Sequence, residues 1–191
     1  MIKLRIFVSS VQKELDEERR AVKTLVTSDP FLDEHCVPIL YEDEPSMLKP
    51  ASQGYLNDLA KCQFYLLIIG SIYGKRFKGL SPIHHEYHFA RRKDLPILVC
   101  VRGDNKIERD PAIQDLIEEI KSDGHKYHRF SDLRQLQRIV LDRLHKNQLP
   151  RGPFSQRGHD IETHLGKRIE VRSGTSCHAA RHEYACSNRV E

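Results

Sequence analysis

Ser9 and Ser10 are the first residues in this chain whose type and position suggest chemistry. They end the short apolar run Ile6–Val8, and a charged, helix-prone segment begins directly after them. A strand that passes directly into a helix places hydroxyls and free backbone N–H groups at the carboxyl edge of a sheet, where α/β proteins bind anionic or nucleotide ligands. We therefore expect one serine to cap the helix and both to be candidates for phosphate or ribose contacts.

Glu86 is the carboxylate that we expect to face the same crevice. Ser81 and Pro82 predict the start of a helix, because Ser is a favoured N-cap residue and Pro is favoured at the first helical position. Glu86 then lies in the second turn, at the margin of the sheet-facing stripe that contains Ile83 and Tyr87. Partial burial would raise its pKa, and a carboxylate so placed can stabilise or attack the anomeric carbon of a ribosyl group. The alternative is a glutamate favoured only by the positive end of the helix.

A glycine-containing loop follows the most apolar segment, Phe64–Ile69, and supplies the remaining ligand-binding candidates. Gly70 and Gly74 permit a tight exit from a strand and close backbone approach, and Tyr73 lies between them. Tyr73 could stack on a base or a nicotinamide-like ring, or it could cover the core. The glycine spacing matches neither a phosphate loop nor a dinucleotide fingerprint.

Metal-binding and other catalytic patterns are weaker. His84 and His88 are four residues apart and share one helix face, but no third ligand is evident nearby. The segment 177–186 contains two cysteines and two histidines in a spacing that matches no standard zinc finger. We therefore predict no metal site and no cofactor.

Composition limits the function classes. The chain has 191 residues, of which 39% are hydrophobic and 30% charged, enough for one domain with a substantial core. No apolar run approaches the roughly 20 residues of a membrane span, and the net charge of +4 is interleaved rather than clustered, so we expect neither membrane nor nucleic-acid binding. Five dispersed cysteines and the lack of a leader-like N-terminus favour reduced thiols in the cytoplasm.

Strand and helix patterns alternate along the first three quarters of the chain. Asp29-Pro30 is expected to break the first helix, and Glu18 falls on the apolar stripe of that helix, so it needs a cationic partner. The predicted strands are Lys3–Val8, Val37–Tyr41, Phe64–Ile69, Pro96–Val101 and Lys126–Phe130. The predicted helices are Gln12–Thr27, Gln53–Lys61 and three others that begin near residues 82, 111 and 132.

These patterns predict a three-layer α/β domain over residues 1–147, with a five-stranded parallel sheet in the flavodoxin-like order 2-1-3-4-5. In that order the first and third strands are neighbours at the switch point, so Ser9 and Glu86 should overlook one hollow. Residues 148–191 are rich in Pro, Gly, His, Arg and Ser and are predicted to be a linker and a loosely ordered tail.

The motifs also occur together in an order that resembles a known family. They are Ile6–Ser10, Glu17–Arg20, Tyr65–Gly70, Tyr73-Gly74, Ser81-Pro82 with Glu86-Tyr87, and Pro96–Val99. The set resembles the TIR-like domain of unknown function found at the N-terminus of STAND-type signalling NTPases and defence proteins. The resemblance covers roughly residues 2–103.

The resemblance implies a TIR-like, flavodoxin-like fold related to nucleoside deoxyribosyltransferases. In TIR NAD hydrolases a glutamate on the helix after a central strand is catalytic, and Glu86 is similar in position. Ser9 and the Tyr73 loop resemble the walls of the nucleotide pocket. The chain departs from the TIR pattern at Ile83–His85, where Trp-Cys is usual, and at Cys62-Gln63, where Ser-Asp is common.

The leading hypothesis is a signalling or defence domain that binds a nucleotide and cleaves NAD at the nicotinamide–ribose bond, with Glu86 as the catalytic residue. Ser9, Ser10, Gly70, Tyr73 and Gly74 are its ligand-binding candidates. One alternative is a non-catalytic module for homotypic interaction or nucleotide sensing, and the other is a nucleoside deoxyribosyltransferase-like enzyme. By analogy with TIR domains, the partner is a second copy, contacted through helix faces and the loop Tyr41–Pro50, or a separate signalling chain.

Overall fold

The computed structural model describes residues 3–40 and 56–148. The predicted loop Tyr41–Pro50, the first part of the predicted helix Gln53–Lys61 and the predicted tail beyond Gln148 lie outside these residues. The strands are β1 (Leu4–Ser9), β2 (Cys36–Ile39), β3 (Phe64–Ile69), β4 (Ile97–Arg102) and β5 (Tyr127–Phe130). The helices are α1 (Asp16–Ser28), α2 (Pro30–His35), α4 (Pro82–Arg92), α5 (Pro111–Ser122) and α6 (Leu133–Gln148). A short helical turn covers residues 56–59.

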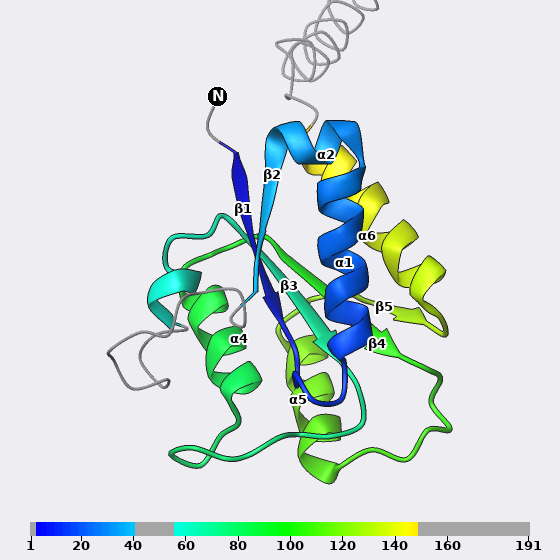
Figure 1. The fold of residues 1–191 in the computed structure, drawn as a ribbon. Coiled ribbons are helices and arrows are strands. Elements are labelled where there is room, and N and C mark those ends of the chain that lie inside the picture. Colours follow the sequence, from blue (N-terminus) through cyan, green and yellow to red (C-terminus); the bar gives the residue numbers. More distant parts are fainter. Residues whose placement is uncertain (1–2, 41–55, 149–191) are drawn as a thin grey trace, which may run out of the picture. The chain divides into compact units, whose positions relative to one another are not determined.

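The five strands form one parallel sheet in the order β2-β1-β3-β4-β5, which confirms the predicted fold class (Figure 1). β1 pairs with β3 so that Ser9 lies beside Leu67, and the switch point falls between these two strands. The chain leaves β1 toward β2 on one side and leaves β3 toward β4 on the other. The connections therefore diverge at the carboxyl edge, where ligands bind in open α/β sheets.

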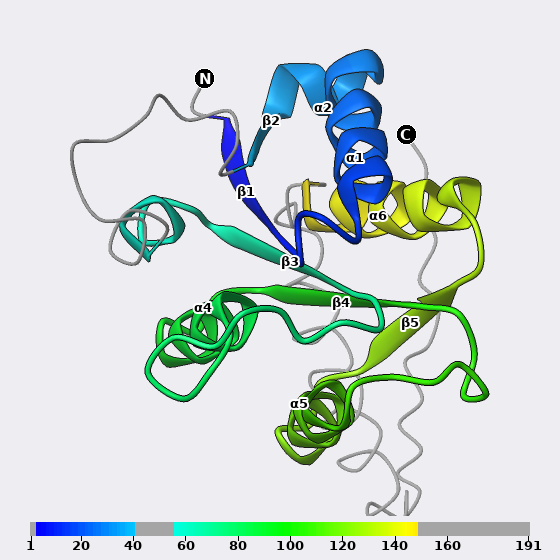
Figure 2. The ribbon, with the colours of Figure 1, turned by 60° about the horizontal axis from the view of Figure 1, so that its bottom comes forward.

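Helices cover both faces of the sheet, as Figure 2 shows, with α1, α2 and α6 on one side and α4 and α5 on the other. The central strand explains why this happens. All six residues of β3 are buried, and they alternate between two separate cores. Phe64, Leu66 and Ile68 pack toward α1, α2 and α6, whereas Tyr65, Leu67 and Ile69 pack toward α4 and α5. A strand buried on both faces reads as a continuous apolar run, as the sequence does here.

The connection after β1 differs from the prediction. A turn at residues 11–15 separates Ser10 from α1, which begins at Asp16 rather than at Gln12. The N-cap residue is Leu15, with no side-chain hydrogen bond, so the expectation that Ser9 or Ser10 caps the helix was wrong. Three acidic residues in the first turn, Asp16–Glu18, complement the helix dipole instead.

Asp29-Pro30 ends α1 as predicted but also begins a helix that the prediction missed. The Asp29 carboxylate accepts a hydrogen bond from the Leu32 backbone N–H at 2.9 Å, which caps α2. Asp110 caps α5 in the same way, with 2.9 Å to the N–H of Ala112. The same Asp-Pro signature thus opens two helices, because a carboxylate satisfies a free N–H and Pro has the backbone angle of a first helical residue.

Glu18 has the cationic partner that its buried position demands. Its carboxylate lies 3.1 Å from a guanidinium nitrogen of Arg102, at the end of β4. The same guanidinium lies 3.2 Å from Glu14. The ion pair joins the start of α1 to the carboxyl end of β4 and gives Glu18 a structural role. In the part of the chain that the structure describes, no helix is long and apolar enough to cross a membrane.

Candidate active site

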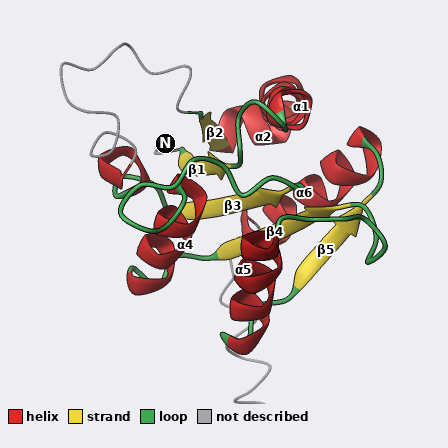
Figure 3. Cartoon of the chain, turned by 90° about the horizontal axis from the view of Figure 1, so that it is seen from below, coloured by secondary structure: helices red, strands yellow, loops and turns green. Residues whose placement is uncertain are grey.

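A cavity of about 420 Å³ opens at the carboxyl edge of the sheet, where the connections after β1 and β3 diverge. Figure 3 looks onto this edge, with α1 and α6 on one side of the strands and α4 and α5 on the other. The cavity lies in the size range of small-molecule sites, roughly 300–1,000 Å³. Its walls come from the end of β1, the turn after it, the loop after β3 and the start of α4. The lining residues are Phe7–Gln12, Arg19, Tyr73–Phe77, Pro82, Ile83 and Glu86.

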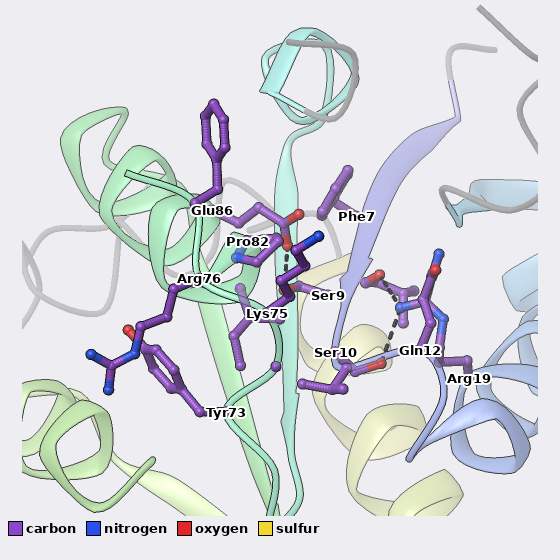
Figure 4. Close-up of a pocket in the computed structure, with 15 residues that line it drawn as sticks. Phe7, Ser9, Ser10, Gln12, Arg19, Tyr73, Lys75, Arg76, Pro82 and Glu86 are labelled. Atoms are coloured by element: carbon purple, nitrogen blue, oxygen red, sulfur yellow. Dashed lines mark hydrogen bonds between the residues drawn. The ribbon is translucent and has the colours of Figure 1, made fainter. Parts of the chain in front are cut away.

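Ser9 and Glu86 meet inside this cavity, although they are 77 residues apart in the sequence. The Ser9 hydroxyl donates a hydrogen bond of 2.5 Å to the Glu86 carboxylate (Figure 4). Ser9 is the last residue of β1 and Glu86 lies in the second turn of α4. The strand and the helix therefore fix both side chains.

The environment of Glu86 favours its neutral form more than water does. Its side chain is 7% exposed, and burial raises its pKa from 4.5 to about 7. The Ser9 hydrogen bond and the charge of Arg19 act in the opposite direction but do not cancel the effect of burial. Within the described lining of the cavity, Glu86 is the only carboxylate. The cavity thus contains one carboxyl group that can change charge near neutral pH.

Ser10 contacts a buried arginine rather than the helix backbone. Arg19 is 2% exposed, and its guanidinium donates to the Val8 carbonyl at 2.9 Å and to the Ser10 hydroxyl at 3.1 Å (Figure 4). Sequence reasoning missed Arg19. The helical spacing of the apolar residues could have indicated it, because position 19 lies on the buried stripe between Leu15 and Val22. Arg19 brings a fixed positive charge to the wall of the cavity.

Tyr73, a predicted ligand-binding residue, forms part of the cavity wall, and its hydroxyl is anchored outside the cavity. The Tyr73 oxygen lies 2.6 Å from Nδ1 of His84, and the residue is 3% exposed. Gly74, next in the loop, also lines the cavity and has φ of +84°, a conformation that glycine adopts without strain. The Arg76 guanidinium lies over the Tyr73 ring, 5.4 Å from its centroid.

Gly70 is a predicted ligand-binding residue that does not line the cavity. A Cβ at this position would collide with the carboxyl group of Glu14. That carboxylate accepts hydrogen bonds from the backbone N–H groups of Ser71 at 2.6 Å and Ile72 at 3.1 Å. Gly70 therefore serves a different purpose from the predicted one. It allows a buried glutamate to hold the first turn of the loop after β3.

Positive side chains gather at the mouth of the cavity. Lys75 and Arg76 are exposed residues of its lining, and buried Arg19 adds a third cation deeper in the wall. The sequence prediction did not single out either residue, because a basic pair in a loop is common on protein surfaces. The two exposed cations Lys75 and Arg76 favour an anionic ligand at this side of the cavity.

A second cluster of titratable side chains lies behind the Tyr73 wall. Nε2 of His84 and Nε2 of His88 each lie 2.7 Å from a different oxygen of Glu119, on the neighbouring helix α5. Burial disfavours the charged form of Glu119, but the hydrogen bonds from the two histidines outweigh it and lower its pKa. The third ligand that the sequence prediction lacked is therefore present in space, 31 residues beyond His88.

Comparison with known proteins identifies a family for this chain but not an activity. A family model described as "Domain of unknown function (DUF4062)" matches residues 5–145. No curated protein matches the chain. The chain is also similar to a solved structure titled "Crystal structure of conserved protein from Enterococcus faecalis V583", at 8% sequence identity and a TM-score of 0.44. That similarity covers 74% of this chain and 99% of the other.

Proposed function

The chain belongs to the domain of unknown function family DUF4062, and we propose that it is a nucleotide-binding enzyme that hydrolyses the nicotinamide–ribose bond of NAD. The observation that supports this proposal is the buried Glu86 carboxyl group, which Ser9 holds at 2.5 Å inside the cavity. This arrangement pairs a carboxylate with a hydroxyl at the switch point of the sheet, the usual position of ligand sites in this fold class.

The environment of Glu86 suits cleavage of a glycosidic bond to ribose. As the base departs, positive charge develops on the ribose ring in an oxocarbenium-like transition state. A carboxylate in a shielded cavity stabilises that charge more strongly than one in water, because the local dielectric constant is lower. Ser9 fixes the orientation of the carboxylate, so little reorganisation is needed during the reaction. The ionised form of Glu86 is the active form in this mechanism.

The phosphates of the ligand would bind Lys75 and Arg76 rather than the N-terminus of α1. The earlier expectation placed them at that helix, but Asp16–Glu18 occupy its first turn and would repel an anion. Lys75 and Arg76 are exposed residues of the cavity lining. In Figure 4 Arg76 lies on the side opposite Arg19, and Lys75 lies between them, beside Ser9. Arginine and lysine donate charge-assisted hydrogen bonds to phosphate oxygens.

The base would pack against the apolar part of the cavity. Phe7, Val11 and Ile83 contribute this surface, and Tyr73 lies in the same wall. Flat rings bind well to such walls, through offset stacking or edge contacts. Because the site is open to solvent at its mouth, we further propose that self-association covers it, so that activity per molecule rises with protein concentration.

The experiment uses the purified full chain with NAD and follows nicotinamide by chromatography. We expect release by the wild type and its loss in Glu86→Gln, which keeps the shape of the side chain but not its charge. Glu118→Gln is the matched control, since Glu118 is exposed on α5 and pairs with Lys121 at the surface. Its rate should equal that of the wild type.

A parallel incubation with a deoxynucleoside and a free base separates the alternatives. Base exchange that requires Glu86 would identify the protein as a deoxyribosyltransferase that forms a covalent glycosyl-enzyme intermediate. If neither product forms at high protein concentration, the enzymatic proposal is wrong. Binding of NAD without turnover would then identify a nucleotide-sensing module. If NAD neither binds nor reacts, a protein-interaction module would be the remaining alternative.

A further inference from the structure

The cluster behind the Tyr73 wall has the composition of a metal site. We propose that His84, His88 and Glu119 bind a divalent transition-metal ion of the zinc type, with water as the fourth ligand. Two imidazoles and one carboxylate are a donor set that zinc takes when one coordination position is left open. This proposal does not depend on the proposed function, because the cluster shares no residue with the Ser9–Glu86 pair.

The geometry brings three donor atoms to one point. His84 and His88 are one turn apart on α4, with ring centroids 4.6 Å apart, and Glu119 reaches them from α5. The three donor atoms all lie within 4.8 Å of one another. Donors that bind zinc at about 2.0–2.2 Å in a tetrahedron are roughly 3.3–3.6 Å apart. The 2.7 Å distances join each imidazole to a different oxygen of Glu119, and these pairs would widen by less than about 1 Å. Any pair of donors as far apart as 4.8 Å would have to move closer by about 1.5 Å.

The surroundings hold the donors in place. The Tyr73 hydroxyl lies 2.6 Å from Nδ1 of His84, on the side of the ring away from Glu119, which is the position of an outer partner that orients a metal-binding histidine. The two helices are also joined nearby, because the Tyr87 hydroxyl donates to Asp123 at 2.7 Å. A metal ion would then add to an existing contact between α4 and α5.

Access and charge permit binding. The side chains of His88 and Glu119 are 32% and 30% exposed, so an ion and a water molecule can reach them, whereas His84 is 9% exposed and forms the base of the site. Arg91 is the nearby competing cation, 4.0 Å from Glu119. Its guanidinium lies closer to Asp123, at 2.8 Å, which draws it away from the cluster.

The test measures zinc binding to the full chain after removal of metal with a chelator, by calorimetric titration. To exclude the cysteines at 177 and 186 as ligands, the titration uses the Cys177→Ser, Cys186→Ser chain as its background. We expect one ion to bind and its binding to be lost in both Glu119→Gln and His88→Gln. Glu118→Gln and His85→Gln are the matched controls, and both variants should keep zinc binding. Glu118 directly precedes Glu119 on α5, and His85 directly follows His84 on α4.

Tyr73→Phe supplies a graded readout. It removes only the outer hydrogen bond to His84, so zinc affinity should fall by roughly 10–100-fold, the effect typical of such partners. Cobalt provides a spectroscopic check, because an ion held by nitrogen and oxygen shows visible bands without the thiolate charge-transfer band. Circular dichroism verifies that each variant is folded. Unchanged zinc binding in folded Glu119→Gln and His88→Gln, or no binding to the wild type, would show that the cluster is held by hydrogen bonds alone.

Discussion

Replacing Glu86 with Gln should change how stability depends on pH. In the folded chain burial raises the Glu86 pKa from 4.5 to about 7. Folding therefore favours the protonated carboxyl group, and this preference corresponds to about 3 kcal/mol, at about 1.4 kcal/mol for each tenfold change in the ionisation constant. The side chain is only 7% exposed, so solvent screens the effect little.

The sign follows from the direction of that pKa change. Below pH 4.5 the carboxyl group is protonated in both the folded and the unfolded chain, so ionisation has no effect on stability. Between pH 4.5 and about 7 the unfolded chain releases the proton while the folded chain keeps it, and the free energy of unfolding falls. Above about pH 7 both states are ionised and the loss is complete. Gln carries no such proton, so the Glu86→Gln variant lacks this decline.

The assay is urea denaturation of wild type and variant at a series of pH values from about 4 to 8.5. A chelator is present so that His84, His88 and Glu119 carry no metal. The free energy of unfolding of the wild type minus that of Glu86→Gln should fall by about 3 kcal/mol across this range. Glu118→Gln, at an exposed site, should give a flat difference. A flat difference for Glu86→Gln as well would refute the placement of this carboxyl group in a shielded cavity.

Three further predictions concern other parts of the structure. Gly70→Ala should displace Glu14 from the loop after β3 and lower the free energy of unfolding by about 1–3 kcal/mol, since the backbone N–H groups of Ser71 and Ile72 lose a charged acceptor; urea denaturation measures this. Cys62 should resist iodoacetamide at pH 8 in the folded chain and react after unfolding, because burial raises its pKa to about 11; mass spectrometry of the peptides detects the label. Replacing Lys75 and Arg76 together with Ala should weaken NAD binding and reduce its salt dependence without changing stability, as calorimetry and denaturation would show.

The sheet order could be predicted because the relevant signals are local. Phe64–Ile69 is a continuous apolar run, and only a strand buried on both faces needs one. The Ser81-Pro82 and Asp110-Pro111 pairs mark the starts of α4 and α5, so the alternation of strands and helices is visible without coordinates. Right-handed crossovers then limit the order of strands to a few arrangements.

The start of α1 could not be predicted as accurately as the order of the strands. Gln12 to Leu15 have helix-compatible residue types, but the chain uses them in a turn that carries Glu14 to the loop after β3. This contact lies 57 residues away in the sequence, so no local pattern encodes it. The same contact explains the error at Gly70, which was expected to approach a ligand and instead approaches the side chain of Glu14.

The positions of the candidate site residues in the fold could be predicted in part, because some of the signals are local and others are not. Glu86 could be placed at the margin of a buried stripe, and Ser9 at a strand end, from helix and strand periodicity alone. Arg19 was missed because the prediction placed Glu18, and not Arg19, on the apolar stripe of the first helix. Glu119 was missed because its partners His84 and His88 lie on a different helix, and the packing of α4 against α5 is a tertiary property.

The most direct test of the central claim is the rate of nicotinamide release from NAD by the wild type, Glu86→Gln and Glu118→Gln under identical conditions. If the carboxylate at position 86 stabilises the transition state, release falls at least about 100-fold in Glu86→Gln and is unchanged in Glu118→Gln. Equal release by all three proteins would contradict the assignment of Glu86 as the catalytic residue.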